Sequence, residues 1–333
     1  MNAVSRQTVH AVEGKSLQLY SLDALRGIAA LMVALFHIKK YIWKTDTSFW
    51  WQSVLQEGYL GVYMFFVISG FIIPYSLSGK DYTIAKFFRF MGKRLLRLHP
   101  PYVLFILLLL FWNYGLYTFK GWGNPVFYDV RQFLLNVSWT APFFGAKWIV
   151  IIFWTLAVEF QYYMLTGLTH PLLMRYRAAP YLMTTACIGL GYLIPSQFLT
   201  IFHYYIFFAI GFQTFLFYTG RTGRVEFMIF MTAASAFILY SGLFMALLAT
   251  LLTVAGIFLL KKDYAVPRFL GNISYSLYLS HGLAGGAVAI FTVGRWPEGV
   301  RFITAVTVAV IFAFIYWRLV ERPFIRLSKK IRM

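Results

Sequence analysis

The sequence predicts an all-α protein, a polytopic transmembrane bundle of about ten helices with both termini in the cytoplasm. Of the 333 residues, 60% are hydrophobic and only 12% are charged, compared with about 25% charged residues in an average soluble domain. The mean hydropathy is +0.68. Apolar runs of about the length that spans a bilayer as a helix, roughly 20 residues, recur along the whole chain.

Ten apolar runs are interpreted as membrane helices, because only a helix satisfies every backbone polar group of an open chain in lipid. The first run follows a polar segment without an apolar core, so we expect a retained anchor and no cleavable signal peptide. The fifth and seventh runs are short, and only Ser241 and Gly242 separate the seventh from the eighth. In chain order the runs lie near 22–42, 58–78, 98–118, 148–168, 180–195, 199–218, 226–241, 243–260, 271–292 and 300–320.

Lysine and arginine are concentrated in alternate connecting segments, which sets the predicted orientation. If the N-terminus is cytoplasmic, the richer segments all lie inside, and an even number of spans returns the C-terminus to that side. The chain then divides into a cytoplasmic segment 1–21, a transmembrane domain 22–321 and a basic cytoplasmic tail 322–333. The 30 Lys and Arg residues against 11 acids form no single block, so we expect membrane lipids and not nucleic acid as partners.

The first predicted helix carries three ionisable residues, Asp23, Arg26 and His37. Ionisable side chains within a membrane are costly and often functional. Arg26 and His37 are 11 positions apart, so they share a helix face and lie about 16 Å apart along the axis. Asp23 lies on nearly the same face and can pair with Arg26. Histidine is a common general base near neutral pH, but membrane-edge snorkelling of Arg26 and a packing role of His37 remain alternatives.

Glu159 is the acid of the fourth apolar run, where a buried carboxylate must be paired or protonated. It is a candidate to orient His37, or to pair with an arginine. Lys93, Arg94 and Arg97 precede the third run on adjacent turns and suit phosphate binding, but from the residues alone anchoring at the membrane edge or binding of anionic lipid is the favoured explanation.

Two further polar groups stand near the C-terminal end of the domain. Ser274 and His281 are seven positions apart on one face of the ninth run, where helix packing is as plausible as catalysis. Glu321 precedes Pro323, which predicts that the last helix ends there. His99, beside two prolines, is interpreted as a boundary residue. The sequence holds no metal-ligand spacing, phosphate-binding glycine loop or GxSxG elbow, so no metal is predicted.

Six segments in order resemble the acyltransferase-3 family, bacterial membrane enzymes that acylate exported polysaccharides, lipopolysaccharide and related glycans. These segments are LDALRGIAALMVALFH at 22–37, GVYMFFVISGFII at 61–73, KRLLRLHPPY at 93–102, FWTLAVEFQYYML at 153–165, LGNISYSLYLSH at 270–281 and VERPF at 320–324. The resemblance implies a multi-pass protein of the bacterial inner membrane.

The resemblance also implies site roles. The family's Arg-then-His signature falls on Arg26 and His37, its basic pair on Arg94 and Arg97, and its glutamate on Glu159. An acyl-CoA, expected to be acetyl-CoA, is then the cytoplasmic co-substrate, and a glycan or lipid-linked sugar hydroxyl is the acceptor. A transporter or flippase of a lipid-linked sugar is the alternative, since buried ionisable groups also mark transport pathways.

Three departures from the family pattern affect these expectations. Tyr63 stands where an acid is frequent, and Phe160 stands where a second acid is common, so Glu159 is the single carboxylate of its segment. Some members carry an additional esterase-like domain, which is not found before Met333. If transfer to the final acceptor needs that domain, we expect a separate protein to supply it. The glycan, the position acylated, a covalent acyl intermediate and the oligomeric state are not predicted.

Overall fold

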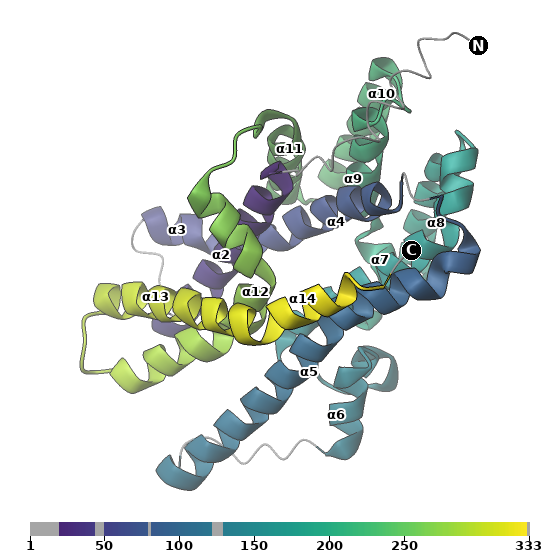
Figure 1. Cartoon of the computed structure of the whole chain (residues 1–333). Coiled ribbons are helices and arrows are strands. Elements are labelled where there is room, and N and C mark those ends of the chain that lie inside the picture. Colours follow the sequence, from purple (N-terminus) through teal and green to yellow (C-terminus); the bar gives the residue numbers. More distant parts are fainter. Residues whose placement is uncertain (1–19, 44–49, 79–80, 122–128, 332–333) are drawn as a thin grey trace.

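The computed structural model describes residues 20–43, 50–78, 81–121 and 129–331, and these residues form helices and connecting turns without a strand (Figure 1). The helices of the first half are α2 (Tyr20–Trp43), α3 (Trp50–Gln56), α4 (Gly61–Leu77), α5 (Phe87–Lys120), α6 (Val130–Val137) and α7 (Trp154–Arg175). Those of the second half are α8 (Ala179–Leu193), α9 (Tyr205–Tyr218), α10 (Arg224–Tyr240), α11 (Phe244–Leu259), α12 (Ala265–Thr292), α13 (Glu298–Tyr316) and α14 (Arg322–Ser328).

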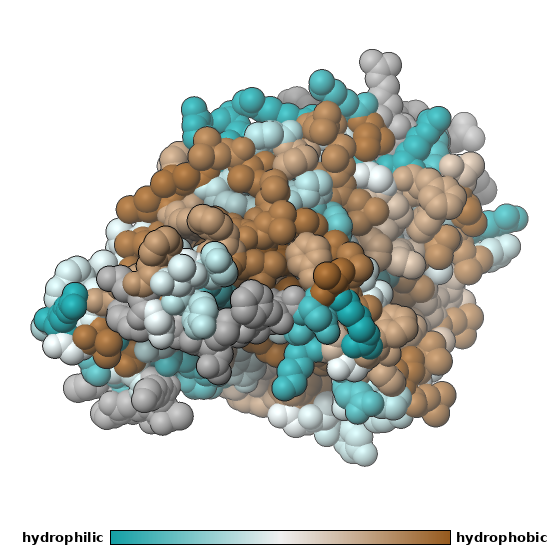
Figure 2. All heavy atoms as spheres, turned by 90° about the horizontal axis from the view of Figure 1, so that it is seen from below, coloured by the Kyte–Doolittle hydropathy of each residue, from teal (hydrophilic) through white to brown (hydrophobic). Residues whose placement is uncertain are grey.

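The predicted all-α class is confirmed, and every predicted apolar run coincides with a helix in the described part of the chain. Five stretches there are long and apolar enough to cross a membrane: Tyr20–Trp43, Trp50–Leu77, Ile84–Phe119, Ile151–Arg175 and Glu298–Ser328. The helices α9 and α11 are apolar but shorter. Figure 2 shows broad areas of hydrophobic residues on one face, as a lipid-facing surface requires. Ten spans and cytoplasmic termini stay predictions.

The prediction of a helix boundary at His99 was wrong. Helix α5 starts at Phe87 and continues through Pro100 and Pro101, so the basic residues of KRLLR lie within the helix and not before it. Neighbouring helices support the proline-containing segment, because the hydroxyls of Tyr275 in α12 and Tyr316 in α13 donate to backbone carbonyls next to and within it. These two hydrogen bonds attach the proline-containing segment to the neighbouring helices, and prolines are tolerated in membrane helices where such neighbours surround them.

The prediction that the last helix ends before Pro323 was also wrong. A π-helical turn, Trp317–Glu321, joins α13 to α14, and the helix continues to Ser328. Pro323 lacks the N–H that an α-helix would require at this position, and the wider turn accommodates that loss. Helix α14 therefore lies alongside the first part of α5 and does not leave the bundle (Figure 1).

Glycines permit the closest helix contacts. Helix α2 lies at the centre of the bundle against α12, α4, α13 and α11. A Cβ atom on Gly27 of α2 would lie 2.7 Å from the backbone nitrogen of Gly271 in α12. In the same way, a Cβ atom on Gly211 of α9 would lie 2.8 Å from the Cα of Gly70 in α4. Small residues let membrane helices approach to backbone contact, so these glycines fix the spacing of the central helices.

We predict that Gly211→Ala destabilises the bundle by about 1–3 kcal/mol, because the added methyl group overlaps the backbone of α4. The thermal unfolding midpoint in detergent measures this. Gly115→Ala in α5 is the matched control, since nothing lies within 4 Å of its added Cβ, and its midpoint should not fall. Equal behaviour of the two variants would contradict the close α4–α9 contact.

Candidate active site

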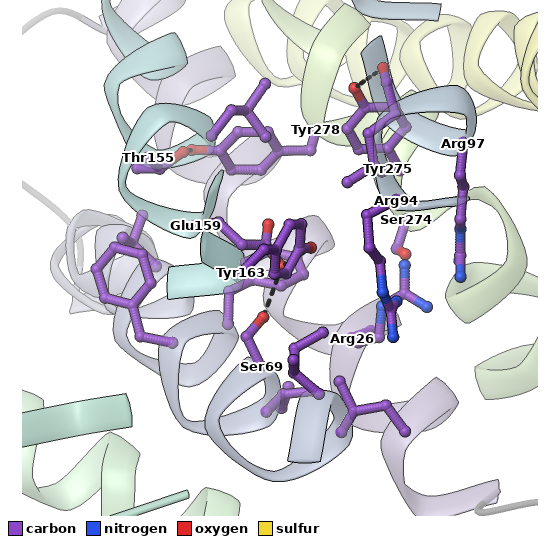
Figure 3. A pocket seen from close by; sticks show the side chains of 18 residues that line it. Arg26, Ser69, Arg94, Arg97, Thr155, Glu159, Tyr163, Ser274, Tyr275 and Tyr278 are labelled. Atoms are coloured by element: carbon purple, nitrogen blue, oxygen red, sulfur yellow. Dashed lines mark hydrogen bonds between the residues drawn. The ribbon is translucent and has the colours of Figure 1, made fainter. Parts of the chain in front are cut away.

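An interior pocket is formed where α2, α4, α5, α7 and α12 meet (Figure 3). One side carries Arg26 from α2 and Arg94 and Arg97 from α5, and Glu159 and Tyr163 of α7 face them across the pocket. The remaining wall is largely apolar, with Phe65, Phe66 and Ile72 among its residues. The first, third and fourth predicted helices thus meet at one site, as expected from the roles that the sequence analysis gives to their charged residues.

The three arginines are held very differently. Arg94 donates to the Ser76 hydroxyl at 2.7 Å and its guanidinium lies 5.6 Å from the ring centre of Tyr163. Arg26 and Arg97 make no hydrogen bond with another residue in the described ranges, and the Nε of Arg97 is buried without a partner. A guanidinium is a fork of N–H donors suited to carboxylates and phosphates. Two of the three cations therefore have donors available to a ligand.

Glu159 is held by hydroxyl groups. Ser69 of α4 and Tyr163, one turn further along α7, each donate to its Oε1 atom at 2.6 Å. Oε2 makes no hydrogen bond with another described residue, and the carboxylate lines the pocket. These two hydrogen bonds fix the position of the carboxylate. No hydrogen bond joins Glu159 to His37 among the described residues, so a role of Glu159 in orienting that histidine stays a prediction.

A second carboxylate, Glu321, lies behind the arginines. It is 1% exposed and accepts a hydrogen bond from the Ser276 hydroxyl at 2.6 Å through Oε2. Arg97 lies close enough to Glu321, Glu159 and Arg26 for their charges to interact. Three interior cations thus face two interior carboxylates. An interior excess of positive charge is costly unless an anion balances it.

His37 lies beyond this pocket and is not part of its lining. Its ring stacks on that of His281 in α12, with the ring centres 5.2 Å apart. Gly61 precedes the pocket residue Val62, and a Cβ atom on Gly61 would contact Val33 of α2. His37 lies one helical turn past Val33. The imidazole is therefore about one turn further along α2 than the end of the pocket. It is partly buried between helices.

Two aromatic side chains connect the pocket with His37. The ring of Tyr278 lines the pocket, and its centre is 6.2 Å from that of His281, which in turn contacts His37. Tyr278 is fixed by a 2.6 Å hydrogen bond between its hydroxyl and that of Thr155. His281 is 1% exposed, and its Nδ1 lies 3.0 Å from the carbonyl oxygen of Leu277. Arg26 and His37 thus share the bundle interior, with the Tyr278 and His281 rings between the pocket and the imidazole.

The other predicted residues lie at the edge of this arrangement. Asp23 forms no ion pair with Arg26 within the described residues, and both line a second hollow beside the pocket. Lys93 lines neither space, and its charge interacts with those of Arg94 and Lys329. Sequence reasoning missed Ser69, Tyr163 and the site role of Glu321, although each lies in one of the family-like segments. Hydroxyl groups in an apolar helix were the available signal.

Comparison with known proteins agrees with this geometry. The family model described as "Acyltransferase domain" matches residues 19–318. Two Staphylococcus aureus proteins, from strains COL and N315, are provisionally named O-acetyltransferases, and each is 25% identical over 360 residues that cover 91% of this chain. A Rhizobium radiobacter protein named "Protein 2 in picA locus" is 34% identical over 107 residues, 32% of this chain and 50% of its own. The chain spans 56% of the length of the Staphylococcus relatives. No solved structure matches.

We predict that Glu159→Ala lowers stability by about 3 kcal/mol, since it leaves two buried hydroxyl groups without their acceptor and removes a counter-charge from the arginines. Glu159→Gln retains an acceptor and should cost less. The thermal unfolding midpoint measures both. Glu226→Gln is the control, because Glu226 pairs with the exposed Arg177 and should contribute under about 1 kcal/mol. A shift for Glu226→Gln as large as that for Glu159→Ala would contradict this account.

Proposed function

The chain belongs to the acyltransferase-3 family, and on that premise we propose that it is a membrane O-acyltransferase. It moves an acyl group, expected to be acetyl, from cytoplasmic acyl-CoA to a carbohydrate hydroxyl of an exported or cell-surface glycan. The observation that carries the proposal is the interior cluster of Arg26, Arg94 and Arg97, with the imidazole of His37 further along the same helix. The provisional O-acetyltransferase names of the Staphylococcus relatives support the type of group transferred.

The arginine cluster suits the anionic donor. CoA carries a diphosphate and a separate phosphate, which guanidinium groups bind through paired hydrogen bonds. Arg26 and Arg97 have donors that no other described residue occupies, whereas Arg94 is fixed by Ser76. In the proposal Arg97 and Arg94 hold phosphate oxygens and Arg26 guides the donor into the pocket. Glu159 and Tyr163 position Arg94 and limit the excess of positive charge.

The apolar side of the pocket suits the uncharged remainder of the donor. Phe65, Phe66 and Ile72 line it. A thioester arm that extends from the arginines along this wall reaches Tyr278 and then the pair of His281 and His37. Arg26 and His37 are separated by about 16 Å along α2, so the donor's phosphates and its reacting carbon lie in different places. Small movements of the Tyr278 and His281 rings would complete the passage.

His37 is the proposed general base. Neither ring nitrogen of His37 is engaged by another described residue, so the nitrogen that carries no hydrogen is available to accept a proton. In direct transfer the imidazole takes the acceptor's hydroxyl proton while the hydroxyl oxygen attacks the thioester carbonyl carbon. The carbon–sulfur bond then breaks, and the thiolate of CoA leaves and is protonated by the imidazolium. The bond formed is the ester, and no oxidant or metal is needed. His281 stacks on His37 and holds its ring plane.

We predict that His37→Ala lowers the rate of acyl transfer at least about a hundredfold, because a positioned general base supplies about that factor or more. The assay follows radiolabelled acetyl from acetyl-CoA to a glycan acceptor with purified protein in lipid nanodiscs. His203→Gln is the control: His203 is bonded to Thr200 and to the Ile194 carbonyl outside the site, and its loss should leave transfer near normal.

Three outcomes would count against the proposal. Near-normal transfer by His37→Ala would remove His37 as the base. Label that stays on the donor with every acceptor offered would favour the transporter alternative. Transfer of label to water at the same rate with and without an acceptor would indicate a hydrolase.

A further inference from the structure

A second hollow lies beside the pocket, at the end of the bundle where α2 begins and α14 ends. Five cations and one acid line it: Arg26 of α2, Arg97 of α5, Arg322, Arg326 and Lys329 of the last helix and its end, and Asp23. The part of the wall supplied by α12 consists of Gly271 and Asn272. Backbone contact between Gly27 and Gly271 holds α2 and α12 together at this end, so Arg26 is fixed at the hollow's inner wall.

The positive charge of this hollow exceeds the negative charge that the described residues supply, since Asp23 is the one acid in its lining. None of Arg322, Arg326 and Lys329 forms an ion pair with an acid in the described ranges. Glu321, the acid next to Arg322 in sequence, points away and is bonded to Ser276 in the interior. Like charges held together on a rigid frame repel one another unless an anion occupies the space between them.

The hollow and the donor pocket share two lining residues. Arg26 and Arg97 line both spaces. The Nε of Arg97 is buried and has no hydrogen-bond partner, which is an expensive state for a guanidinium nitrogen without a ligand. An anion that spans the two spaces could use donors of Arg97 on either side.

The last helix is attached firmly enough to act as one wall of a binding site. It packs along α5, and the π-helical turn that precedes it places Trp317 at the rim of the hollow. The guanidinium of Arg322 lies 5.3 Å from the ring centre of Trp317, and the ring of Phe314 stacks on that of Trp317 with the centres 6.0 Å apart, so the cation is held in place beside the hollow. π-Helical turns are often found at functional sites.

We propose that this hollow binds the phosphorylated adenosine end of the CoA donor, with Arg322, Arg326 and Lys329 on its phosphate monoester. The diphosphate then lies at Arg97 and Arg26, and the thioester arm enters the donor pocket. This inference rests on the proposed acyltransferase function and adds a binding site on the last helix. The chemistry recognised is a dianionic phosphate next to a flat heterocycle.

Anionic lipid headgroups share part of that chemistry, because they also carry phosphate near a membrane surface. One observation favours the nucleotide. The hollow shares Arg97 and Arg26 with the donor pocket, whereas a lipid site needs no residue in common with that pocket.

The test measures binding of CoA, dephospho-CoA and pantetheine to purified protein in nanodiscs of zwitterionic lipid, by calorimetry. Dephospho-CoA lacks only the phosphate monoester, and pantetheine lacks the nucleotide altogether. We expect wild-type protein to bind CoA at least about tenfold more tightly than dephospho-CoA, since a charge-assisted phosphate contact is worth about that factor. The triple variant Arg322→Gln, Arg326→Gln, Lys329→Gln should lose this preference and keep its affinity for pantetheine.

The matched control is the double variant Arg318→Gln, Lys330→Gln, which removes neighbouring exposed cations that do not line the hollow. It should bind all three compounds as the wild type does. Retained pantetheine binding by the triple variant shows that it is folded. If it loses pantetheine binding as well, single substitutions at Arg326 and Lys329 replace it in the comparison.

The outcomes separate the inference from the function on which it rests. If wild-type protein binds neither CoA nor pantetheine, the acyl-CoA function fails. If it binds CoA but does not distinguish dephospho-CoA, or if the triple variant keeps the preference, the nucleotide site is refuted and the function stands. If the triple variant binds CoA and dephospho-CoA as the wild type does, and loses only the binding of anionic phospholipid added to the nanodiscs, the hollow is a lipid site.

Discussion

The close approach of α2 and α12 is the contact on which the rest of the arrangement depends. Because Gly27 and Gly271 have no side chains, the two helices touch through their backbones. Arg26 directly precedes Gly27 and therefore lies beside that contact. One turn past the end of the pocket, the same pair of helices brings His37 against His281. A single helix interface therefore sets both ends of the proposed reaction path.

Electrostatic balance determines what can enter this path. Three arginines and Glu159 line the pocket, Glu321 is buried near Arg97, and the second hollow adds three cations from α14 and its end. The two carboxylates are held by hydroxyl groups, which leaves them little freedom to turn toward Arg26 or Arg97. In the proposed function an anionic donor supplies the missing negative charge. A neutral sugar alone would leave the cations uncompensated, so the pocket suits an anionic donor better than a neutral acceptor.

Much of the fold follows from the sequence because lipid imposes a simple rule: long apolar runs become helices. The rule fails where tertiary contacts override local signals. The prolines after His99 and the one after Arg322 suggest helix ends, yet tyrosines from α12 and α13 support the first pair and a π-helical turn accommodates the second. Such compensation depends on residues distant in sequence, so no local pattern reveals it.

In the candidate site, too, some residues could be predicted from the sequence and others could not. Helical periodicity was sufficient to place Arg26 and His37 on one face, and the basic run was sufficient to select Arg94 and Arg97. These sequence patterns could not assign a partner to Glu159, because Ser69 lies on another helix and carries no charge that would mark it as a partner. The role of the last helix was hidden for a related reason: its basic residues also fit the orientation rule, and that explanation was adequate without a site.

The separation between the arginines and His37 has a consequence for turnover. In the proposed function, the cations hold a part of the coenzyme that is the same before and after the acyl group has left. These contacts raise the affinity for acyl-CoA and for free CoA equally, so they do not let the enzyme discriminate between substrate and product. Free CoA should then compete directly with its own thioester. An enzyme of this design would respond to the ratio of charged to discharged carrier in the cell, so glycan modification would follow the supply of activated acyl groups.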